Sequence, residues 1–209
     1  MKKRKLINYL CLVGILSLVF YILHDVVGAL NYPGYNWTSQ AVSDLTATDS
    51  PVYGISHSLS LIHGIFSCIC CTLVCILVQK EKKKSLRLGV YLFTTMNFIS
   101  AIGYLLFPLS SKGYDGSFQS FMHVYVITIA VVLLSIISLI LISVGAFKSK
   151  KKLLGTLSIV ALFLMFFGAA GSGILPKNVF GIVERFSTYS AVVFTTILGI
   201  YGFNKIEKN

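Results

Sequence analysis

The stretch Asn31–Pro51, NYPGYNWTSQAVSDLTATDSP, separates two long apolar runs and is the longest segment that is neither apolar nor rich in lysine. Turn-forming residues stand at its start. The amphipathic side chains of Tyr32, Tyr35 and Trp37 are of the kind that lie at the level of lipid headgroups. We therefore expect a structured loop at a membrane surface, between two helices that cross the bilayer.

Inside this stretch, Ser43 and Asp44 are not explained as caps of a long helix. One interpretation is that Asp44 accepts hydrogen bonds from backbone amides and fixes the turn. The alternative is that Asp44 belongs to a functional site. Either Asp49 or Ser50 is predicted to cap the next helix, with Pro51 as its first residue.

The composition identifies a membrane protein. Of the 209 residues, 56% are hydrophobic and 12% are charged, and the mean hydropathy is +0.82, which excludes an ordinary soluble domain. Six apolar runs have spanning length, so we predict an all-α integral membrane protein, a single six-helix transmembrane domain over residues 1–209. The predicted helices are Leu6–Ala29, Tyr53–Val78, Leu88–Phe107, Phe118–Phe147, Leu154–Leu175 and Val183–Phe203.

The net charge of +11 is divided unequally between the two sides of the predicted bundle. Fifteen of the 18 Lys and Arg residues lie near the two termini or in the loops after the second and fourth helices, and only Lys112, Lys177 and Arg185 lie on the other side. The positive-inside rule then predicts a multi-pass protein of the plasma membrane with both termini in the cytoplasm. Topology and anionic lipid account for the basic charge, so no nucleic-acid partner is expected and membrane lipids are the predicted partners.

A short pattern, G-x-x-x-x-P, occurs at Gly28–Pro33, Gly103–Pro108 and Gly171–Pro176. Each copy marks the outer end of an odd-numbered predicted helix. This spacing suggests three repeated helical hairpins whose outer loops converge around one centre.

Five of the seven acidic residues lie on the outer side and all four histidines lie in the outer half or middle of the predicted bundle, where we expect a candidate pocket. Its members are Asp25, Asp44, His57, Asp115, His123, Glu184 and Arg185, with His24 beside them. A second polar stripe, Ser56, Ser60, His63 and Ser67, should face the bundle, and His63 is expected to form an interhelical hydrogen bond. No H-E-x-x-H or G-x-S-x-G motif is present, so the sequence defines no catalytic residue, metal or cofactor.

Three functions fit the location of the acidic and histidine side chains on the outer side. The first is a pocket that binds or processes a lipid headgroup or small amphiphile, in which arginine holds a phosphate. The second is a structural or partner-binding role without catalysis, and the third is a small transporter. We further expect His123, Glu184 and Arg185 to meet Asp44 or Asp25 in one outer cavity, although Asp25 and Arg185 could also simply pair.

Several short motifs together carry a family resemblance. They are AVSDLTATDSP at Ala41–Pro51 after a YP turn, FP at Phe107 and Pro108, His123 at the start of the fourth helix, and ER at Glu184 and Arg185. In these the chain resembles the prokaryotic membrane-protein family catalogued as domain of unknown function (DUF) 998. More distantly, VSDL is similar to the SDTG-type loop of the Frag1/DRAM/Sfk1 membrane proteins, from which Leu45 departs. The resemblance implies a membrane fold and carries no established chemistry.

Overall fold

The structure is a computed structural model that describes residues 4–205, so Lys2, Lys3 and Lys208 of the basic clusters lie outside the described residues. Within this range it is all-helical, and six spans are long and apolar enough to cross a membrane, which confirms the predicted fold class. The helices are α1 (Leu6–Leu10), α2 (Val13–Asn31), α3 (Tyr53–Val78), α4 (Lys84–Leu106), α5 (Phe118–Phe121), α6 (Thr128–Lys148), α7 (Lys152–Ile174) and α8 (Phe180–Asn204).

Some helix boundaries differ from those predicted. The helix α4 begins at Lys84, four residues before the apolar run, because a lysine at a membrane surface can extend its ammonium into water while its backbone stays helical. The first span is broken between α1 and α2, where the Cys70 thiol donates to the carbonyl oxygen of Cys11 at 3.4 Å. The fourth span contains α5, a π-helical turn at Met122–Ile127, and α6.

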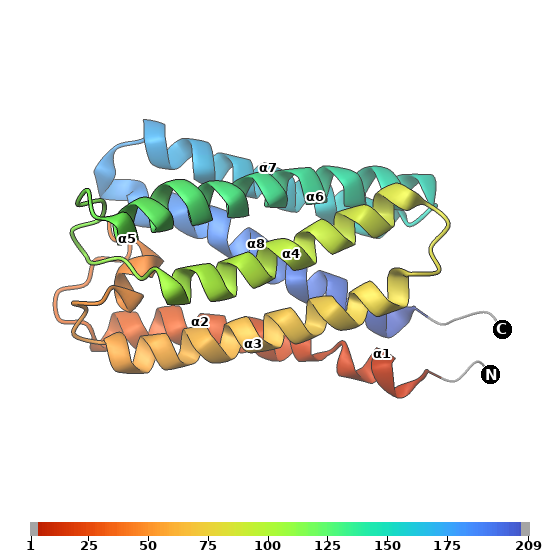
Figure 1. Ribbon diagram of the computed structural model, residues 1–209, viewed down its shortest axis with the longest axis horizontal. Helices are drawn as coiled ribbons and strands as arrows, with labels where there is room; N and C mark the ends of the chain where they lie inside the picture. The colour runs from red at the N-terminus through yellow and green to blue at the C-terminus, as the bar shows by residue number, and fades with distance from the viewer. Residues whose placement is uncertain (1–3, 206–209) are drawn as a thin grey trace.

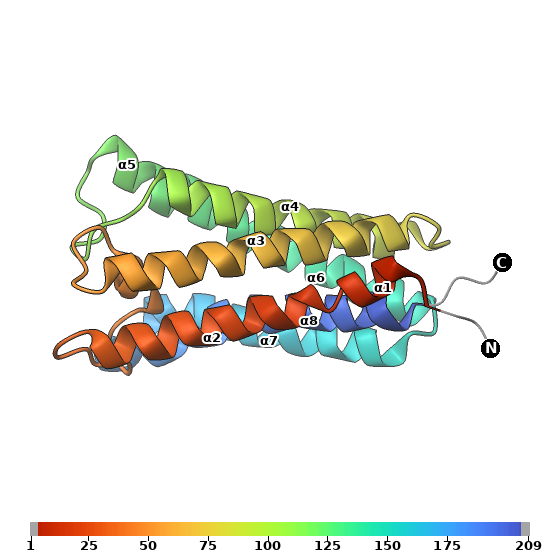
Figure 2. The same cartoon turned by 90° about the horizontal axis from the view of Figure 1, so that it is seen from below.

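The six spans lie side by side along the long axis of the molecule (Figures 1 and 2). We call the end with the loops 32–52, 107–117 and 175–179 the loop end, and the opposite end, where the described chain begins and finishes, the basic end. Successive spans are antiparallel neighbours, so that α2 packs with α3, α4 with α6, and α7 with α8. The last helix also packs against α2 and α3, which closes the bundle.

The helix α8 runs obliquely through this arrangement (Figure 1). Near the loop end it lies on α7, where a Cβ at Gly168 would be 2.8 Å from the carbonyl oxygen of Val183. Near the basic end it lies on the first span, where a Cβ at Gly199 would be 2.5 Å from the carbonyl oxygen of Cys11. Glycine permits both close approaches, so the backbone of α8 lies close to that of α7 near one end and to that of the first span near the other.

The repeated G-x-x-x-x-P pattern coincides with equivalent helix ends. Three helices end two residues before a proline, at Asn31 before Pro33, Leu106 before Pro108 and Ile174 before Pro176. The glycine of each copy faces the returning helical span of its hairpin, with Gly28 next to Ser56, Gly103 next to Ile127 and Gly171 next to Val183. Helix ends and glycine contacts therefore follow the predicted hairpin pattern.

The predicted span of the second helix, Tyr53–Val78, is confirmed, but the predicted cap and first residue of that helix were wrong. The helix α3 begins at Tyr53, so Pro51 is not its first residue and Asp49 is not its cap. The Asp49 carboxylate instead accepts hydrogen bonds from the amide and hydroxyl groups of Ser111, at 2.7 and 2.6 Å. These bonds lower the pKa of Asp49 and join two loops that are distant in sequence.

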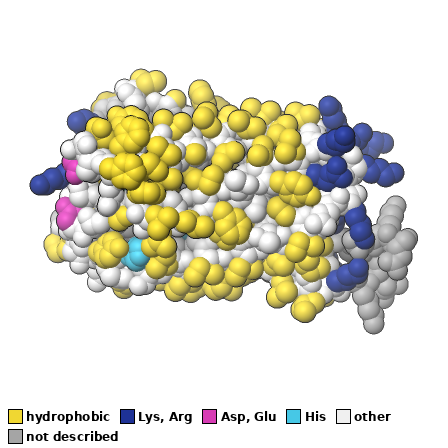
Figure 3. Space-filling model, in the orientation of Figure 1, with side chains coloured by type: hydrophobic (Ala, Val, Ile, Leu, Met, Phe, Trp, Pro, Cys, Tyr) yellow, Lys and Arg dark blue, Asp and Glu magenta, His cyan; other side chains and the backbone are white. Residues whose placement is uncertain are grey.

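The larger cluster of buried apolar side chains includes Phe93 and Phe194, whose rings meet at 5.2 Å. A smaller buried cluster, which includes Tyr21, Leu45 and Val192, lies toward the loop end. Figure 3 shows hydrophobic side chains along the sides of the face in view, with Lys and Arg gathered at the basic end and Asp and Glu at the loop end. This pattern suits a membrane-spanning bundle.

The Glu81 carboxylate is the centre of a polar cluster at the basic end. Glu81 is paired with Lys151 and, at 2.8 Å, with Lys205, and the hydroxyl of Tyr201 donates to it at 3.0 Å. Burial opposes the ionisation of Glu81, but the hydrogen bonds from the two lysines prevail and lower its pKa to about 2. The cluster joins the loop after α3, the start of α7 and the end of α8.

Candidate functional site

The loop between α2 and α3 lies directly against the first turn of α8. A Cβ at Gly181 would be 2.2 Å from the carbonyl oxygen of Gln40 and 2.4 Å from that of Trp37. The amide of Ile182 donates to the carbonyl oxygen of Thr38 at 3.2 Å. Only glycine allows backbone to approach backbone so closely, so Gly181 fixes where the loop sits on α8.

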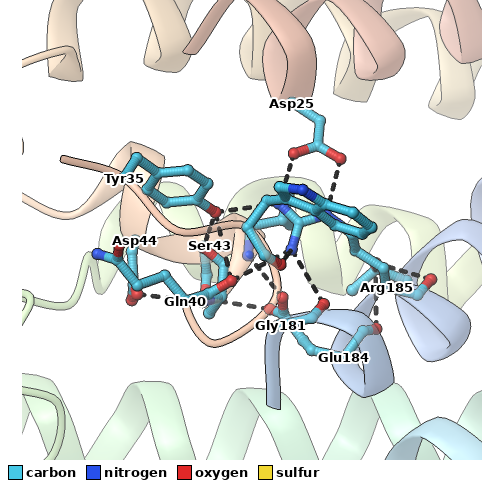
Figure 4. A network of polar contacts seen from close by, with 12 residues as sticks. Asp25, Tyr35, Gln40, Ser43, Asp44, Gly181, Glu184 and Arg185 are labelled. Carbon is cyan, nitrogen blue, oxygen red and sulfur yellow. Dashed lines mark hydrogen bonds and ion pairs between the residues drawn. The ribbon is translucent and has the colours of Figure 1, made fainter. Parts of the chain in front are cut away.

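Arg185 is the centre of the polar network at this contact (Figure 4). Its Nε and Nη2 atoms form a fork onto Asp25, at 3.0 Å to Oδ2 and 2.7 Å to Oδ1, and Nη2 also donates to the Tyr35 hydroxyl at 3.0 Å. The Nη1 group donates to three carbonyl oxygens, those of Trp37 (2.8 Å), Gln40 (3.2 Å) and Gly181 (3.0 Å). A guanidinium has five N–H donors, and here every one has an acceptor.

Glu184 performs the complementary task of accepting hydrogen bonds from the same loop. Its Oε2 atom accepts from the Val42 amide at 2.6 Å, and Oε1 accepts from the Ser43 hydroxyl at 3.2 Å. Val42 opens a short 3₁₀ helix, Val42–Thr46, whose first amides lack partners within the helix. Adjacent residues of α8 therefore satisfy both the donors and the acceptors of the loop.

The structure agrees with the first interpretation of Asp44, in which its carboxylate accepts a hydrogen bond from the loop backbone. Its Oδ2 atom accepts a hydrogen bond from the Ala41 amide at 3.1 Å, across the start of the 3₁₀ helix. Burial raises the pKa of Asp44, although the Ala41 amide favours the ionised form. The side chain is half-buried and its oxygens turn toward the loop backbone.

Two tyrosines complete the surroundings of the Asp25–Arg185 pair, whose side chains are each 11% exposed. The Tyr189 hydroxyl donates to Asp25 Oδ2 at 2.9 Å. The Tyr35 hydroxyl donates to the carbonyl oxygen of Ala41 at 2.6 Å, and burial raises the pKa of Tyr35 to about 12. The ion pair is thus held from α2, from α8 and from the loop between α2 and α3.

A groove of about 870 Å³ adjoins this network. Its wall is mostly apolar and comes from α2, α7 and α8, with Val26, Leu30, Leu157, Leu164, Phe186 and Val193 among its members. It follows α8 from Ile182 to Ile197, a distance of about 22 Å at the rise of an α-helix. At the loop end the groove finishes at Asp25, Arg185 and Trp37.

The structure brings four of the predicted pocket residues together and leaves three in other contacts. Asp25, Asp44, Glu184 and Arg185 meet through the loop described above. The other three are His57, Asp115 and His123. The ring of His57 stacks on Tyr53 at 4.8 Å, and His123 Nδ1 lies 2.6 Å from the carbonyl oxygen of Phe107.

Asp115 has a local role in the loop 107–117. Its Oδ1 atom accepts a hydrogen bond from the Ser117 amide at 3.0 Å. Hydrogen bonds from Ser120 and Ser117 lower the pKa of Asp115 to about 2, so this carboxylate stabilises the start of α5.

The polar stripe of α3 faces the bundle, as predicted, with His63 against α2 and the Ser67 hydroxyl donating to Asn97 of α4. His63 Nδ1 lies 2.9 Å from the Ser17 hydroxyl, which is the expected interhelical contact. His24 lies on the same side of α2 and is only 3% exposed. Within residues 4–205 neither ring nitrogen of His24 has a hydrogen-bond partner.

The sequence did not point to Gln40, Gly181 or Tyr189. The backbone contacts of Gln40 and Gly181 leave no side-chain signature. Tyr189 had a usable signal, because it stands four residues after Arg185 and therefore on the same side of the helix. No cluster of three His, Cys, Asp or Glu side chains suited to a metal ion occurs among the described residues.

A comparison with protein families gives a match to the family described as "Protein of unknown function (DUF998)" over residues 15–201. The chain belongs to the DUF998 family. The match begins inside α2 and runs to the last turn of α8, so it covers the loop, the ion pair and the groove. Comparisons with curated proteins and with solved structures gave no match.

Proposed function

We propose that this DUF998 protein binds a membrane amphiphile, with the apolar tail in the groove along α8 and the head beside Asp25 and Arg185. The observation that carries the proposal is the groove itself, which joins an apolar wall to a polar end. Its volume of about 870 Å³ lies within the range of about 300–1,000 Å³ that is usual for ligand sites.

The exposure of the lining residues supports access from the bilayer. Val160 of α7 and Val193 of α8 line the groove and are 47% and 39% exposed. In a membrane, these exposed side chains face lipid tails. A tail could therefore enter sideways, and the length of about 22 Å along α8 is most of the roughly 30 Å thickness of a hydrocarbon core.

We also propose the orientation that the charges predict, with the basic end in the cytoplasm of a cell bounded by its plasma membrane. The described lysines of the loops 79–83 and 149–151 gather at that end. The groove head then lies in the outer leaflet, where amphiphiles from outside the cell or from that leaflet are accessible.

The test uses an amphiphile whose acyl chain carries a photoactivatable diazirine, added to the protein in lipid nanodiscs. We expect saturable labelling of α7 and α8 peptides, competed by the unlabelled amphiphile. Val193→Trp should fill the groove and reduce this labelling about fivefold or more, because the loss of a buried chain contact is worth about 1 kcal/mol or more. Ile69→Trp is the matched control, since Ile69 is 44% exposed on α3 and does not line the groove.

Equal labelling of all six spans, or equal labelling of the two tryptophan variants, would overturn the proposal. The structural role would then be the better description. The hydrogen bonds that tie the loop to Glu184 and Arg185 favour that second candidate, because they need no ligand.

A further inference from the structure

We infer that the head of the bound amphiphile is uncharged and carries a hydroxyl group, as in a monoacylglycerol or a long-chain alcohol. The inference rests on the proposed function and specifies its ligand class. It departs from the initial expectation that Arg185 would hold a phosphate. Three features of the groove head lead to it: the occupied guanidinium, the surrounding charge, and the hydrogen-bonding groups that stay available.

The first feature is that Arg185 has no donor to offer. Its fork is occupied by Asp25 and its remaining N–H groups by Tyr35 and the loop carbonyls. A phosphate could gain a bidentate contact only by displacing Asp25, which would leave that carboxylate buried without its partner. Arginine at this position therefore acts as a clamp for the loop.

The second feature is the sign of the surrounding charge. Three carboxylates, Asp25, Asp44 and Glu184, lie in the network with one guanidinium. The other described basic residues of the loop end, Lys112 and Lys177, are exposed and do not line the groove. Of the charged residues, only Asp25 and Arg185 line the groove, and they pair with each other, so an anionic head would meet no unpaired positive charge there.

A cationic head is disfavoured for a separate reason. The Arg185 guanidinium lies 5.8 Å from the centre of the Trp37 ring and 6.0 Å from that of Tyr35. These are the aromatic faces at the groove head that an ammonium group would use, and a cation there already lies beside them. Like charges at such short range would repel.

The third feature is the pair of groups left available at the groove head. Asp25 Oδ1 accepts one hydrogen bond, from Arg185, and a carboxylate oxygen can accept another. Within the part of the chain that the structure describes, the indole N–H of Trp37 has no acceptor, and its side chain is 55% exposed at the groove. A hydroxyl can donate to the first group and accept from the second, which neither a phosphate nor a quaternary ammonium does.

The experiment compares three probes that share one diazirine-bearing chain, in nanodiscs at neutral pH. The heads are a glycerol monoester, a glycerol phosphate monoester and a trimethylammonium. We expect the glycerol monoester to label the groove peptides about tenfold more than either charged probe, the size of one buried hydrogen-bonding mismatch. Trp37→Phe should lower labelling by the glycerol monoester about threefold, whereas Tyr32→Phe, a polar group lost from the same loop outside the groove, should leave it unchanged.

The outcomes separate the two proposals. Labelling of the groove by a charged probe as strong as that by the glycerol monoester would overturn the head assignment and leave tail binding intact. No groove labelling by any probe would overturn both. Equal labelling of Trp37→Phe and the parent would also contradict the head assignment, because the predicted donor would then have no role.

Discussion

At each end of the bundle a charged side chain joins several segments of the chain, but the groups that it binds differ between the two ends. At the basic end, Glu81 binds the side chains of Lys151, Lys205 and Tyr201. At the loop end, Arg185 binds Asp25 and a set of backbone carbonyls, while Glu184 binds a backbone amide. Long lysine side chains can adjust their position, whereas backbone groups fix the course of the chain itself.

The apolar packing next to the two ends also differs. The larger cluster of buried apolar side chains, which includes Phe93 and Phe194, extends to the basic end at Leu77, Val78 and Leu86. The loop end stands over a groove that α2, α7 and α8 line together. The comparison teaches that polar contacts with the loop 32–52 position the helices at the loop end. Such contacts can leave a groove between helices, whereas a continuous apolar core would fill it.

Loss of Asp25 should produce the largest effect on stability. Asp25→Ala leaves the Arg185 guanidinium without its main partner at a site where both side chains are 11% exposed. We expect the free energy of unfolding to fall by about 3–5 kcal/mol, measured by denaturant titration in detergent micelles. Lys151→Ala at the basic end should cost about 0–1 kcal/mol, since Lys151 is 28% exposed and Lys205 still pairs with Glu81.

A double variant distinguishes the missing partner from a general disturbance. Asp25→Ala combined with Arg185→Met removes the unpaired charge, so part of the lost stability should return. If the double variant is less stable than Asp25→Ala by the full amount expected for an independent change, the ion pair is not the reason for the loss. If Lys151→Ala proves as harmful as Asp25→Ala, the contrast between the two ends fails.

The contact of the loop with Gly181 should have the next largest effect. In Gly181→Ala the new methyl group would overlap the carbonyl oxygens of Gln40 and Trp37, which are backbone atoms and cannot turn aside. We expect a loss of about 2–3 kcal/mol in the free energy of unfolding, by overpacking. Gly173→Ala is the matched control near the same end, because nothing lies within 4 Å of a Cβ there. It should be neutral or slightly stabilising, and a loss equal to that of Gly181→Ala would contradict the contact.

The sequence predicted those features that depend on local patterns. Hydropathy located the six spans, and the prolines at 33, 108 and 176 located three helix ends to within two residues. The pairing of Asp25 with Arg185 was one of the stated alternatives, because a charge at membrane depth needs a partner. These predictions required no knowledge of how the helices cross.

The groove and the occupied guanidinium could not be predicted in the same way. The oblique course of α8 depends on close contacts at Gly168 and Gly199 with segments far away in sequence. The acceptors of Arg185 include the carbonyl oxygens of Trp37 and Gln40, and every residue type carries such an oxygen. For the same reason the sequence suggested a phosphate ligand for an arginine that the folded loop already occupies.

The two ends should also respond differently to acid, with a smaller effect. Hydrogen bonds from Lys151 and Lys205 outweigh burial and lower the pKa of Glu81 from 4.5 to about 2. A lowered pKa in the folded state means that this stability is fully present above the unfolded value and is lost as the pH falls through the folded value. We therefore expect the basic end to lose about 1 kcal/mol between about pH 4.5 and pH 2, after allowance for partial solvent screening.

Hydrogen exchange at the amides of residues 79–83 and 149–151, compared with 41–47 at the loop end, measures this difference. Burial raises the pKa of Asp44, so its ionised form costs stability at neutral pH, and protonation on acidification relieves that cost. The segment 41–47 should hence keep its protection over the pH range in which the basic end begins to exchange. Glu81→Gln should remove the pH dependence at the basic end, because the amide stays neutral throughout. Faster exchange at 41–47 than at 79–83 during acidification would reverse the ranking of the two ends and show that the lysine cluster is the more rigid of the two.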